Sequence, residues 1–589
     1  MGFFLYLCAV FLMARHLLHL ILWLFVVETA WSIPANRSPF TVTNSDGTVL
    51  TITLYGDECC HFYATLDGVP VVEEENGDWR LAPELKDSIN QIWSERSTRL
   101  NLRRQQRAAQ NKTRQAFGYP TTYSGQKKGI VLLVEFPDKA MKSVNTRDKF
   151  DKKFNQKGYN EDDHEGSVHD YFYDQSYGQF DLTFDVFGPI KVSQNYAYYG
   201  ENDKNSNDKY VGILAAEACR LANQNYDINW ADYDWDGDKE VDQVFIIYAG
   251  YGEHAGASKN AIWPHESSLT LAKRSGDGEG AIRLGGQIID TYAMSCELRG
   301  TSGSKMDGIG AACHEFTHCL GLPDFYDVKY AGGFGMQHWD IMASGNNNGP
   351  SGHGEIPAGF TAYERWFAGW LNLIELDESI TITDMPCLND EPVAYIIYNE
   401  GNHNEYFILE NRQPTGWHQY VNYYTGMHGL LVTHVDYYRD IWVTNTVNSV
   451  KKHQRMSIIP AGNNYGTFNG STYSVTADQY RSHLFPGNRY VTELTNESHA
   501  SCGGELFNRN IGGTKYMNKP ITDIRESNGL ISFQFMGGSE AMDIKDVANS
   551  TSSSVTYYTL DGVQIEQPTQ PGIYIEKKNG TTKKIWLTP

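Results

Sequence analysis

The sequence predicts a multidomain α+β protein, and three observations support this class. The chain has 589 residues, which corresponds to about four domains at roughly 150 residues each. β-type runs separated by turn residues fill the N-terminal part and the part after Trp370, whereas helical and β patterns mix between them. Hydrophobic residues make up 41% and charged residues 20% of the chain, so it has enough apolar surface to form packed cores.

The charge of the chain argues against a nucleic-acid-binding function. The sequence has 49 Lys and Arg residues against 71 Asp and Glu residues, and its formal net charge is −22. A surface this acidic repels phosphate backbones and anionic lipid headgroups. We therefore expect no nucleic-acid partner.

Residues 1–32 have the layout of a secretory signal peptide. A mostly apolar run over residues 17–27 follows the basic Arg15, and small residues precede the expected cleavage after Ser32. Because Met13 opens a complete signal, we expect translation to start there and the protein to be exported without a stable membrane span. An uncleaved anchor helix is the alternative, although the apolar run is short for a span of about 20 residues.

Four regions follow the signal peptide. The first consists of short β-type runs joined by turn pairs, such as Asp46-Gly47, and ends in a basic helical stretch. The second mixes helices and strands and opens with the apolar run Gly129–Glu135, which is typical of a buried strand. The third is β-rich and sandwich-like, and the last carries two hairpin signals, Asp561-Gly562 and Asn579-Gly580. The expected boundaries are 33–126, 127–370, 371–537 and 538–589.

The basic stretch Arg103–Arg114 has little apolar surface to bury, so we expect it to stay open to proteases. The buried strand from Gly129 onward should resist them. Cleavage between Arg103 and Lys128 is therefore the expected maturation step, and it would release the N-terminal β unit from the rest of the chain.

The cysteines leave two alternatives open. The chain has 9 cysteines, and removal of the signal peptide leaves an even number, which permits disulfides in an exported protein. Their spacing contains no CxxC pair, so free buried thiols are equally consistent. The adjacent Cys59 and Cys60 lie in an apolar-aromatic run that favours strand core over a metal-capping thiol.

The segment around His314 carries the strongest chemical signal. At about 100° per residue, His314 and His318 lie on one face of a helix, so both imidazoles can reach one metal ion. Glu315 stands beside them, where a general base would act on a water molecule. The sequence therefore predicts a catalytic zinc site and hydrolytic chemistry.

The residues that follow predict a third ligand. Gly321 suits a left-handed helix cap and Pro323 prevents another helical turn, so the chain bends and returns Asp324 under the two histidines. Three protein ligands leave a fourth position for water, as in catalytic zinc sites. His338 is the main rival of Asp324 for this role.

Two further residues are candidates for this site. Met342 is followed by small residues in the run Trp339–Gly345, the expected place for a Met-turn beneath the metal. Tyr363 follows closely enough in the sequence to be a candidate for stabilising the oxyanion.

An acidic loop indicates a calcium site. Its alternating carboxylates can point inward together and supply the six to eight oxygen ligands that calcium takes. The loop register can begin at Asp232 or at Asp234, and the position of Gly237 favours the first. A solvated acidic turn is the alternative. The candidate ligands are Asp232, Asp234, Asp236, Asp238 and Asp242.

A third group of polar residues, His428, His434 and Asp436, shares one face of a predicted strand. Core or turn histidines are more frequent than metal ligands in such a place. We therefore expect no second metal site there.

The chain resembles the secreted metallopeptidases of the immune inhibitor A family, a metzincin-related group with the pattern HExxHxxGxxD. The resemblance implies a zinc-dependent, metzincin-like catalytic domain over 127–370, a pro-region over 33–126, and protein or peptide substrates. It also implies that His314, His318 and Asp324 bind zinc. The strings that carry it are Gly56–Glu58, Gly129–Phe136, Asp242–Gly250, Ile262–His265, His314–Asp327, Trp339–Gly345 and Glu410–Arg412.

The last region resembles the C-terminal sorting segments of type IX secretion cargo in Bacteroidetes. The resemblance rests on Tyr558–Gly562, Pro571–Ile575 and the pair Lys583-Lys584. It implies contact with the secretion machinery and a secreted or cell-surface location in a bacterium. A β-hairpin cap on the preceding domain is the alternative.

Two other functions are compatible with the sequence. One is a surface adhesin or glycan-binding protein on a peptidase scaffold that no longer cuts, which the intact ligands and Glu315 argue against. The other is a zinc amidase that acts on cell-wall or glycan amides, which would keep the metal and change the substrate.

Overall fold

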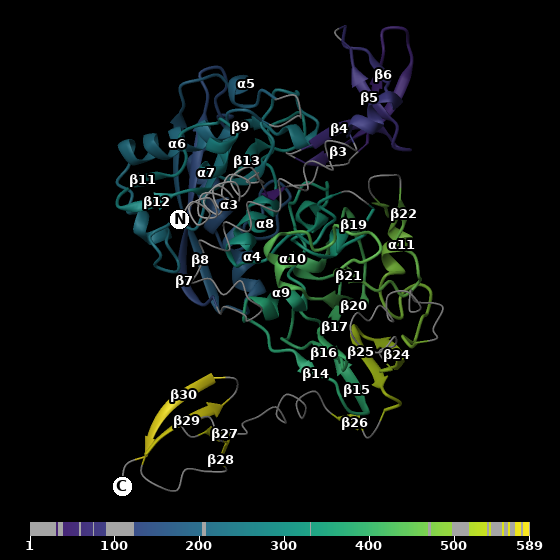
Figure 1. Cartoon of the computed structure of the whole chain (residues 1–589). Coiled ribbons are helices and arrows are strands. Elements are labelled where there is room, and N and C mark those ends of the chain that lie inside the picture. Colours follow the sequence, from purple (N-terminus) through teal and green to yellow (C-terminus); the bar gives the residue numbers. More distant parts are fainter. Residues whose placement is uncertain are drawn as a thin grey trace, which may run out of the picture.

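The structure is a computed structural model of the whole chain (Figure 1). Within the described part of the chain, no helix is long and apolar enough to cross a membrane. Residues 1–30 of the expected signal peptide and the basic stretch Arg103–Arg114 lie outside the described residues, whereas Trp31 and Ser32 form a short strand that pairs with His265 and Glu266. The structure describes residues 31–32, 39–57, 60–74, 76–89, 123–202, 208–329, 332–468, 473–496, 518–538, 541–542, 556–558, 564–565, 572–578 and 581–587.

A six-stranded sheet organises the central region. The apolar run predicted as a buried strand forms most of β7, and Ile130 to Val134 are fully buried, which confirms that prediction. β7, β8, β9 and β13 are parallel, whereas β10 runs antiparallel to β13. The strand order is β1 (Trp31–Ser32), β10 (His265–Ser268), β13 (Thr291–Leu298), β9 (Val244–Tyr251), β7 (Gly125–Glu135) and β8 (Phe180–Lys191).

Helices cover both faces of this sheet. Val131 and Leu133 share a core with α3 (Arg147–Asn155), α4 (Val168–Gln175) and α8 (Gly310–Cys319). Leu132 and Val134 point to the other face, where α6 (Val211–Asn225) and α7 (Leu269–Arg274) pack. Parallel strands need crossover connections that place helices on the faces of the sheet. The central region is therefore a layered α/β domain, which corrects the α+β prediction for this part of the chain.

The N-terminal β unit is a five-stranded antiparallel meander, as its turn pairs predict. Gly47, Gly68 and Gly77 have positive φ angles of 84°, 82° and 84°, which a residue with a side chain adopts only with strain. The strands are β2 (Phe40–Thr43), β3 (Val49–Asp57), β4 (Cys60–Thr65), β5 (Pro70–Glu73) and β6 (Trp79–Leu81).

One buried contact joins this β unit to the central domain. His61 Nε2 lies 2.9 Å from Glu253 Oε1, and both side chains are buried. The His61 ring also stacks on Trp263, with the ring centroids 4.4 Å apart. Burial raises the pKa of Glu253, and His61 opposes this rise. The unit thus docks on the short helix η3 (Glu253–Ala255).

Two sheets after Trp370 pack against each other as a β-sandwich. The first contains β14 (Ile374–Glu375), β16 (Tyr395–Asn399), β17 (Asn402–Arg412), β20 (Gly429–Asp436) and β21 (Met456–Ile458). The second contains β24 (Ile521–Ser527), β25 (Leu530–Phe535), β15 (Ile380–Met385) and β26 (Ala541–Met542). Phe407 and Leu409 of β17 share a core with Phe533 of β25.

The sandwich shares its other face with the central domain. Tyr406 and Ile408 alternate with Phe407 and Leu409 along β17, and they belong to the same core as α8. One hydrophobic core therefore continues across residue 370.

The remaining elements are short. The last region forms a four-stranded sheet with β28 (Gln564–Ile565), β27 (Thr556–Tyr558), β29 (Gly572–Lys578) and β30 (Thr581–Leu587) in that order, which confirms its hairpins. Figure 1 draws this sheet apart from the other layers.

Further short helices are α5 (Tyr196–Tyr199), α9 (Ala362–Phe367), α10 (Arg439–Val443) and α11 (Ala477–Arg481). Further strand pairs are β11 (Ile282–Leu284) with β12 (Gln287–Ile289), β18 (Tyr420–Val421) with β19 (Tyr424–Thr425), and β22 (Thr467–Phe468) with β23 (Tyr473–Ser474).

The shared core predicts that the central domain does not fold alone. A fragment of residues 123–370 would expose the apolar surface that Tyr406 and Ile408 cover, so it should lack a cooperative unfolding transition and be digested rapidly by trypsin. A chain that lacks only residues 556–589 serves as the control and should unfold cooperatively. A protease-resistant 123–370 fragment would contradict the shared core.

Candidate metal centre

Helix α8 positions the predicted ligands from a fully buried location. Phe316 packs edge-on against Phe184 of β8, with the ring centroids 5.1 Å apart, so this side of the helix faces the sheet. At its first residue, a Cβ on Gly310 would lie 1.7 Å from the carbonyl oxygen of Asn346. Only glycine allows this close approach. Helix α8 is thereby held against the segment that follows Met342.

Two backbone carbonyls orient the histidines. His314 Nδ1 lies 2.7 Å from the Ile341 carbonyl oxygen, and His318 Nδ1 lies 2.8 Å from that of Leu322. Because a carbonyl only accepts hydrogen bonds, each Nδ1 carries the proton and each Nε2 keeps its lone pair. This is the arrangement in which histidines bind a metal through Nε2.

The bend after α8 brings Asp324 to the same point. Gly321 has a positive φ of 95° and its amide donates to the His318 carbonyl, as the predicted left-handed cap requires. Asp324 Oδ1 then lies 3.3 Å from His314 Nε2 and 3.6 Å from His318 Nε2. All three side chains are buried.

The donor set fits a zinc ion. Among the described residues, His314 Nε2 and Asp324 Oδ1 are buried with no hydrogen-bond partner. Buried polar atoms are normally paired, and a cation bound between these atoms would satisfy them. Ligand atoms of His314, Glu315 and His318 also lie within 4.8 Å of one another. Glu315 is therefore close enough to act on a group held by the histidines.

Asn445 is a part of this site that the sequence did not reveal. Its side-chain oxygen accepts a hydrogen bond of 2.5 Å from the Asp324 amide, and its side-chain nitrogen donates to Asp324 Oδ2. Asn445 follows α10 with a positive φ of 49°, a conformation that asparagine tolerates. The residue is distant in the sequence from Asp324 and belongs to no motif.

Met342 contacts the segment that carries Asp324 through its backbone, and its role as a Met-turn stays a prediction. Its side chain is fully buried, and its carbonyl accepts a hydrogen bond of 2.7 Å from the amide of Phe325. The preceding residue, Ile341, supplies the carbonyl that orients His314. The turn therefore supports both the helix and the bend.

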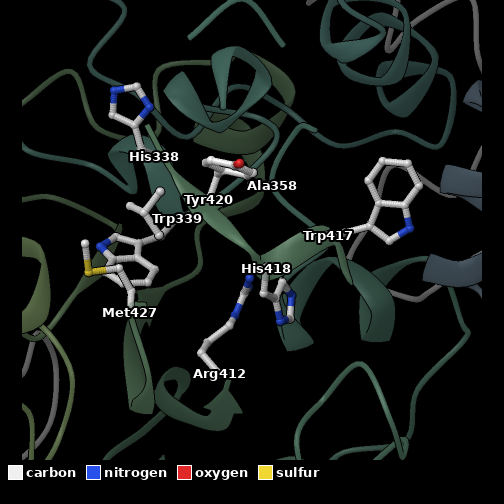
Figure 2. A pocket seen from close by; sticks show the side chains of 9 residues that line it. His338, Trp339, Ala358, Arg412, Trp417, His418, Tyr420 and Met427 are labelled. Atoms are coloured by element: carbon white, nitrogen blue, oxygen red, sulfur yellow. The ribbon is translucent and has the colours of Figure 1, made fainter. Parts of the chain in front are cut away.

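His338 lines a different part of the protein. It borders a small cavity together with Trp339, Arg412 and His418 (Figure 2). Its Nδ1 lies 3.0 Å from Asn348 Oδ1, whereas Asp324 is the residue that meets the two imidazoles.

Tyr363 is fully buried in α9. Its hydroxyl accepts a hydrogen bond of 2.8 Å from the indole of Trp442, and its ring packs edge-on against Phe325. Burial raises the pKa of Tyr363 well above the usual range. Its role in stabilising an oxyanion stays a prediction.

The acidic loop gathers three of its five candidate ligands. Carboxylate oxygens of Asp234, Asp236 and Asp238 lie within 4.8 Å of one another. Asp232 instead lies 3.7 Å from Lys128 Nζ, and Asp242 accepts a hydrogen bond of 2.6 Å from the Trp235 amide. Asp232 and Asp242 thus have other partners. The three clustered carboxylates belong to the loop register that begins at Asp234.

The polar face of β20 forms separate pairs, as expected for core and turn histidines. His434 Nε2 lies 2.9 Å from Glu405, and His428 Nδ1 lies 2.7 Å from Glu526. Asp436 contacts His453 at 2.5 Å. The three residues therefore have different partners.

Two buried carboxyl groups support the Met-turn. Asp340 Oδ1 accepts a hydrogen bond of 2.7 Å from the Met342 amide, and Glu364 caps α9 through the Thr361 amide. Burial raises the pKa of Asp340 to about 7, and the pKa of Glu364 rises well above its usual range through burial and the charge of Asp340. The pair therefore retains protons that an unfolded chain would release.

Comparisons with known proteins show that the sequence of the central region is similar to those of peptidases. Residues 119–371 match the model described as the immune inhibitor A peptidase M6, catalytic domain. Pre-pro-metalloprotease PrtV of Vibrio cholerae serotype O1 (strain M66-2) is 30% identical over 285 residues, which cover 41% of this chain and 30% of that protein. Immune inhibitor A of Bacillus thuringiensis subsp. alesti is 27% identical over 292 residues, which cover 42% of this chain and 41% of that protein. The match thus covers less than half of either curated relative.

Replacement of Asn445 by Ala should weaken metal binding. Asp324 would lose the partner of Oδ2, and supporting residues of this kind change metal affinity by about 10- to 100-fold. Asn411, a buried asparagine that bonds the Met385 and Gly529 carbonyls, offers the matched control. Competition with a chelator measures the affinity. Equal zinc affinities for Asn445→Ala and Asn411→Ala would contradict the role of Asn445.

The Asp340–Glu364 pair predicts a pH dependence of stability. Because the pKa of Asp340 rises from 3.8 to about 7 on folding, the native state binds more protons between these values, and the free energy of unfolding falls as pH rises through this window. One such group contributes a slope of at most about 1.4 kcal/mol per pH unit. Asp340→Asn should reduce the slope measured by urea unfolding between pH 5 and 7. The exposed Asp377→Asn is the control, and an unchanged slope in Asp340→Asn would refute the assignment.

Proposed function

We propose that this protein is a zinc-dependent endopeptidase that hydrolyses peptide bonds in proteins. The observation that carries the proposal is the convergence of His314, His318 and Asp324 on one buried point beside Glu315. The match of residues 119–371 to a peptidase catalytic domain, and a relative named a metalloprotease, support the reaction class.

His314, His318 and Asp324 would hold the zinc ion, and Asn445 would keep Asp324 in place. A zinc ion bound there would lower the pKa of a bound water molecule and polarise the carbonyl that is attacked. Glu315 accepts the proton of the attacking water and then delivers it to the leaving amine. Tyr363 is the proposed donor to the oxyanion, because its hydroxyl oxygen accepts the hydrogen bond from Trp442 and leaves its own O–H to donate.

We also propose that the N-terminal region keeps the precursor latent. The unit of β2 to β6 is docked through His61 on η3, and its tether would be cut between Arg103 and Lys128. The word pre-pro in the name of the relative PrtV supports a precursor of this kind. Residues 1–32 would export the chain, and residues 538–589 would direct it to the cell surface or medium of a bacterium.

The Asp234, Asp236 and Asp238 cluster is the proposed calcium site. Three carboxylates within 4.8 Å repel one another unless a cation lies between them. Calcium would therefore bind the folded loop and not the unfolded chain.

Glu315→Gln should retain zinc and lose turnover of casein by at least about 10²-fold, because the amide cannot accept the proton while the ligands are unchanged. Zinc content by atomic absorption and release of soluble peptides are the two measurements. The exchange Glu405→Gln, at a buried glutamate of β17 that pairs with His434, is the matched control and should keep activity.

Normal proteolysis by pure Glu315→Gln protein would remove Glu315 from this role. A wild-type protein that binds zinc and cuts no protein substrate would favour the adhesin or the amidase instead.

The acidic loop should make thermal stability depend on calcium. A cation that binds only the native state raises the melting temperature once its concentration exceeds the dissociation constant. The double variant Asp234→Asn and Asp236→Asn should lose this shift and keep its zinc. Asp377→Asn provides a surface control, and a full calcium shift in the double variant would place the site elsewhere.

A further inference from the structure

A second group of metal-ligating side chains lies outside the site described above. His254 is in η3, Cys296 is in β13, and Asp307 precedes α8. All three are almost completely buried, with exposed fractions of 5%, 2% and 5%. Asp307 is held beside β13 because its amide donates a hydrogen bond of 2.9 Å to the Glu297 carbonyl.

The spacing of the three residues fits one zinc ion. Cys296 Sγ lies 3.5 Å from Asp307 Oδ2, and the ligand atoms of all three residues lie within 4.8 Å of one another. Bond lengths of about 2.3 Å to sulfur and about 2.0 Å to oxygen in a tetrahedral site separate these two ligand atoms by about 3.5 Å. The thiol and the carboxylate therefore already stand at the separation that zinc requires.

His254 supplies an independent observation. Its Nδ1 is buried and has no hydrogen-bond partner among the described residues. Burial lowers the pKa of His254 to about 4, so the ring is neutral and this nitrogen can offer a lone pair. A Cβ on Gly252 would lie 2.4 Å from this nitrogen, and the Gly252 amide also interacts with the Cys296 thiol. His254 Nδ1 and the thiol thus approach the same glycine.

The surrounding charges are compatible with a divalent cation. A thiolate and a carboxylate together neutralise Zn²⁺, and metal binding would displace the proton that burial now keeps on Cys296. Lys153 lies close to the cluster, and its Nζ donates to the Asp307 carbonyl oxygen at 2.6 Å. Burial lowers the pKa of Lys153 to about 8. Arg299 pairs with Asp163 and Glu355.

We propose that His254, Cys296 and Asp307 bind a second Zn²⁺ ion, in addition to the ion proposed at His314. This site would tie η3 to the end of β13. Because η3 also carries Glu253, the partner of His61, the ion would stabilise the surface on which the N-terminal β unit docks. The competing explanation is a metal-free cluster in which the thiol donates to the Asp307 carboxylate.

Cobalt substitution distinguishes the two explanations. Co²⁺ bound to a thiolate gives a charge-transfer absorption in the near ultraviolet, and the ligand set at His314 contains no sulfur. The full-length protein, reconstituted with Co²⁺ in the presence of calcium, should bind about two cobalt ions per chain and show this absorption. One cobalt ion per chain without the absorption would overturn the proposal.

Variants assign the absorption to its residue. Cys296→Ser should remove the absorption and one cobalt ion, whereas Cys219→Ser, at another buried thiol on α6, should change neither. His314→Ala should remove the other ion and keep the absorption. If Cys296→Ser does not fold, His254→Gln and Asp307→Asn each serve in its place through the loss of one ion. An absorption that survives Cys296→Ser would refute the site.

Discussion

The structure of the metal centre depends on one contact, the approach of the Asp324 carboxylate to two imidazoles inside the protein. A carboxylate in such a place is costly unless it is paired, and here Asp324 Oδ1 faces the Nε2 atoms of two histidines. The chain holds the three groups together with the Gly321 bend and the side chain of Asn445. A cation bound between these three groups would therefore offset the free-energy cost of burying the Asp324 carboxylate.

The β-sandwich also helps to hold Asp324 in place. Alternate residues of β17 face the second sheet and the central domain, so this strand is buried on both sides. The segment after β20 can then bring α10 and Asn445 against the bend at Asp324. In the sequence, the region after residue 370 resembles an accessory domain, yet it supplies Asn445 to the candidate metal site. It can do so because the β-sandwich and the central domain share one core.

Several buried ionisable groups lie around the central sheet, and each has a different neighbouring group as its partner. Glu253 has His61 as its partner, Asp340 has a pKa that burial raises beside Glu364, and Cys296 lies beside Asp307. The sequence has an excess of acidic residues, but this net negative charge does not set the charge state of the buried groups. Their state follows from burial, which makes the charged form of each group costly unless a counter-charge is near.

The sequence by itself determined the local features of this protein. The periodicity of α8, the left-handed cap at Gly321, the buried strand β7 and the turns of the N-terminal unit follow from short-range rules, and all are present. Only the tertiary structure decided which distant residues meet. Asn445 beside Asp324, His254 beside Cys296 and the shared core across residue 370 arise from packing between elements far apart in the chain. A single sequence carries no local signal for such contacts, because they depend on how complete layers pack and not on the spacing of neighbouring residues.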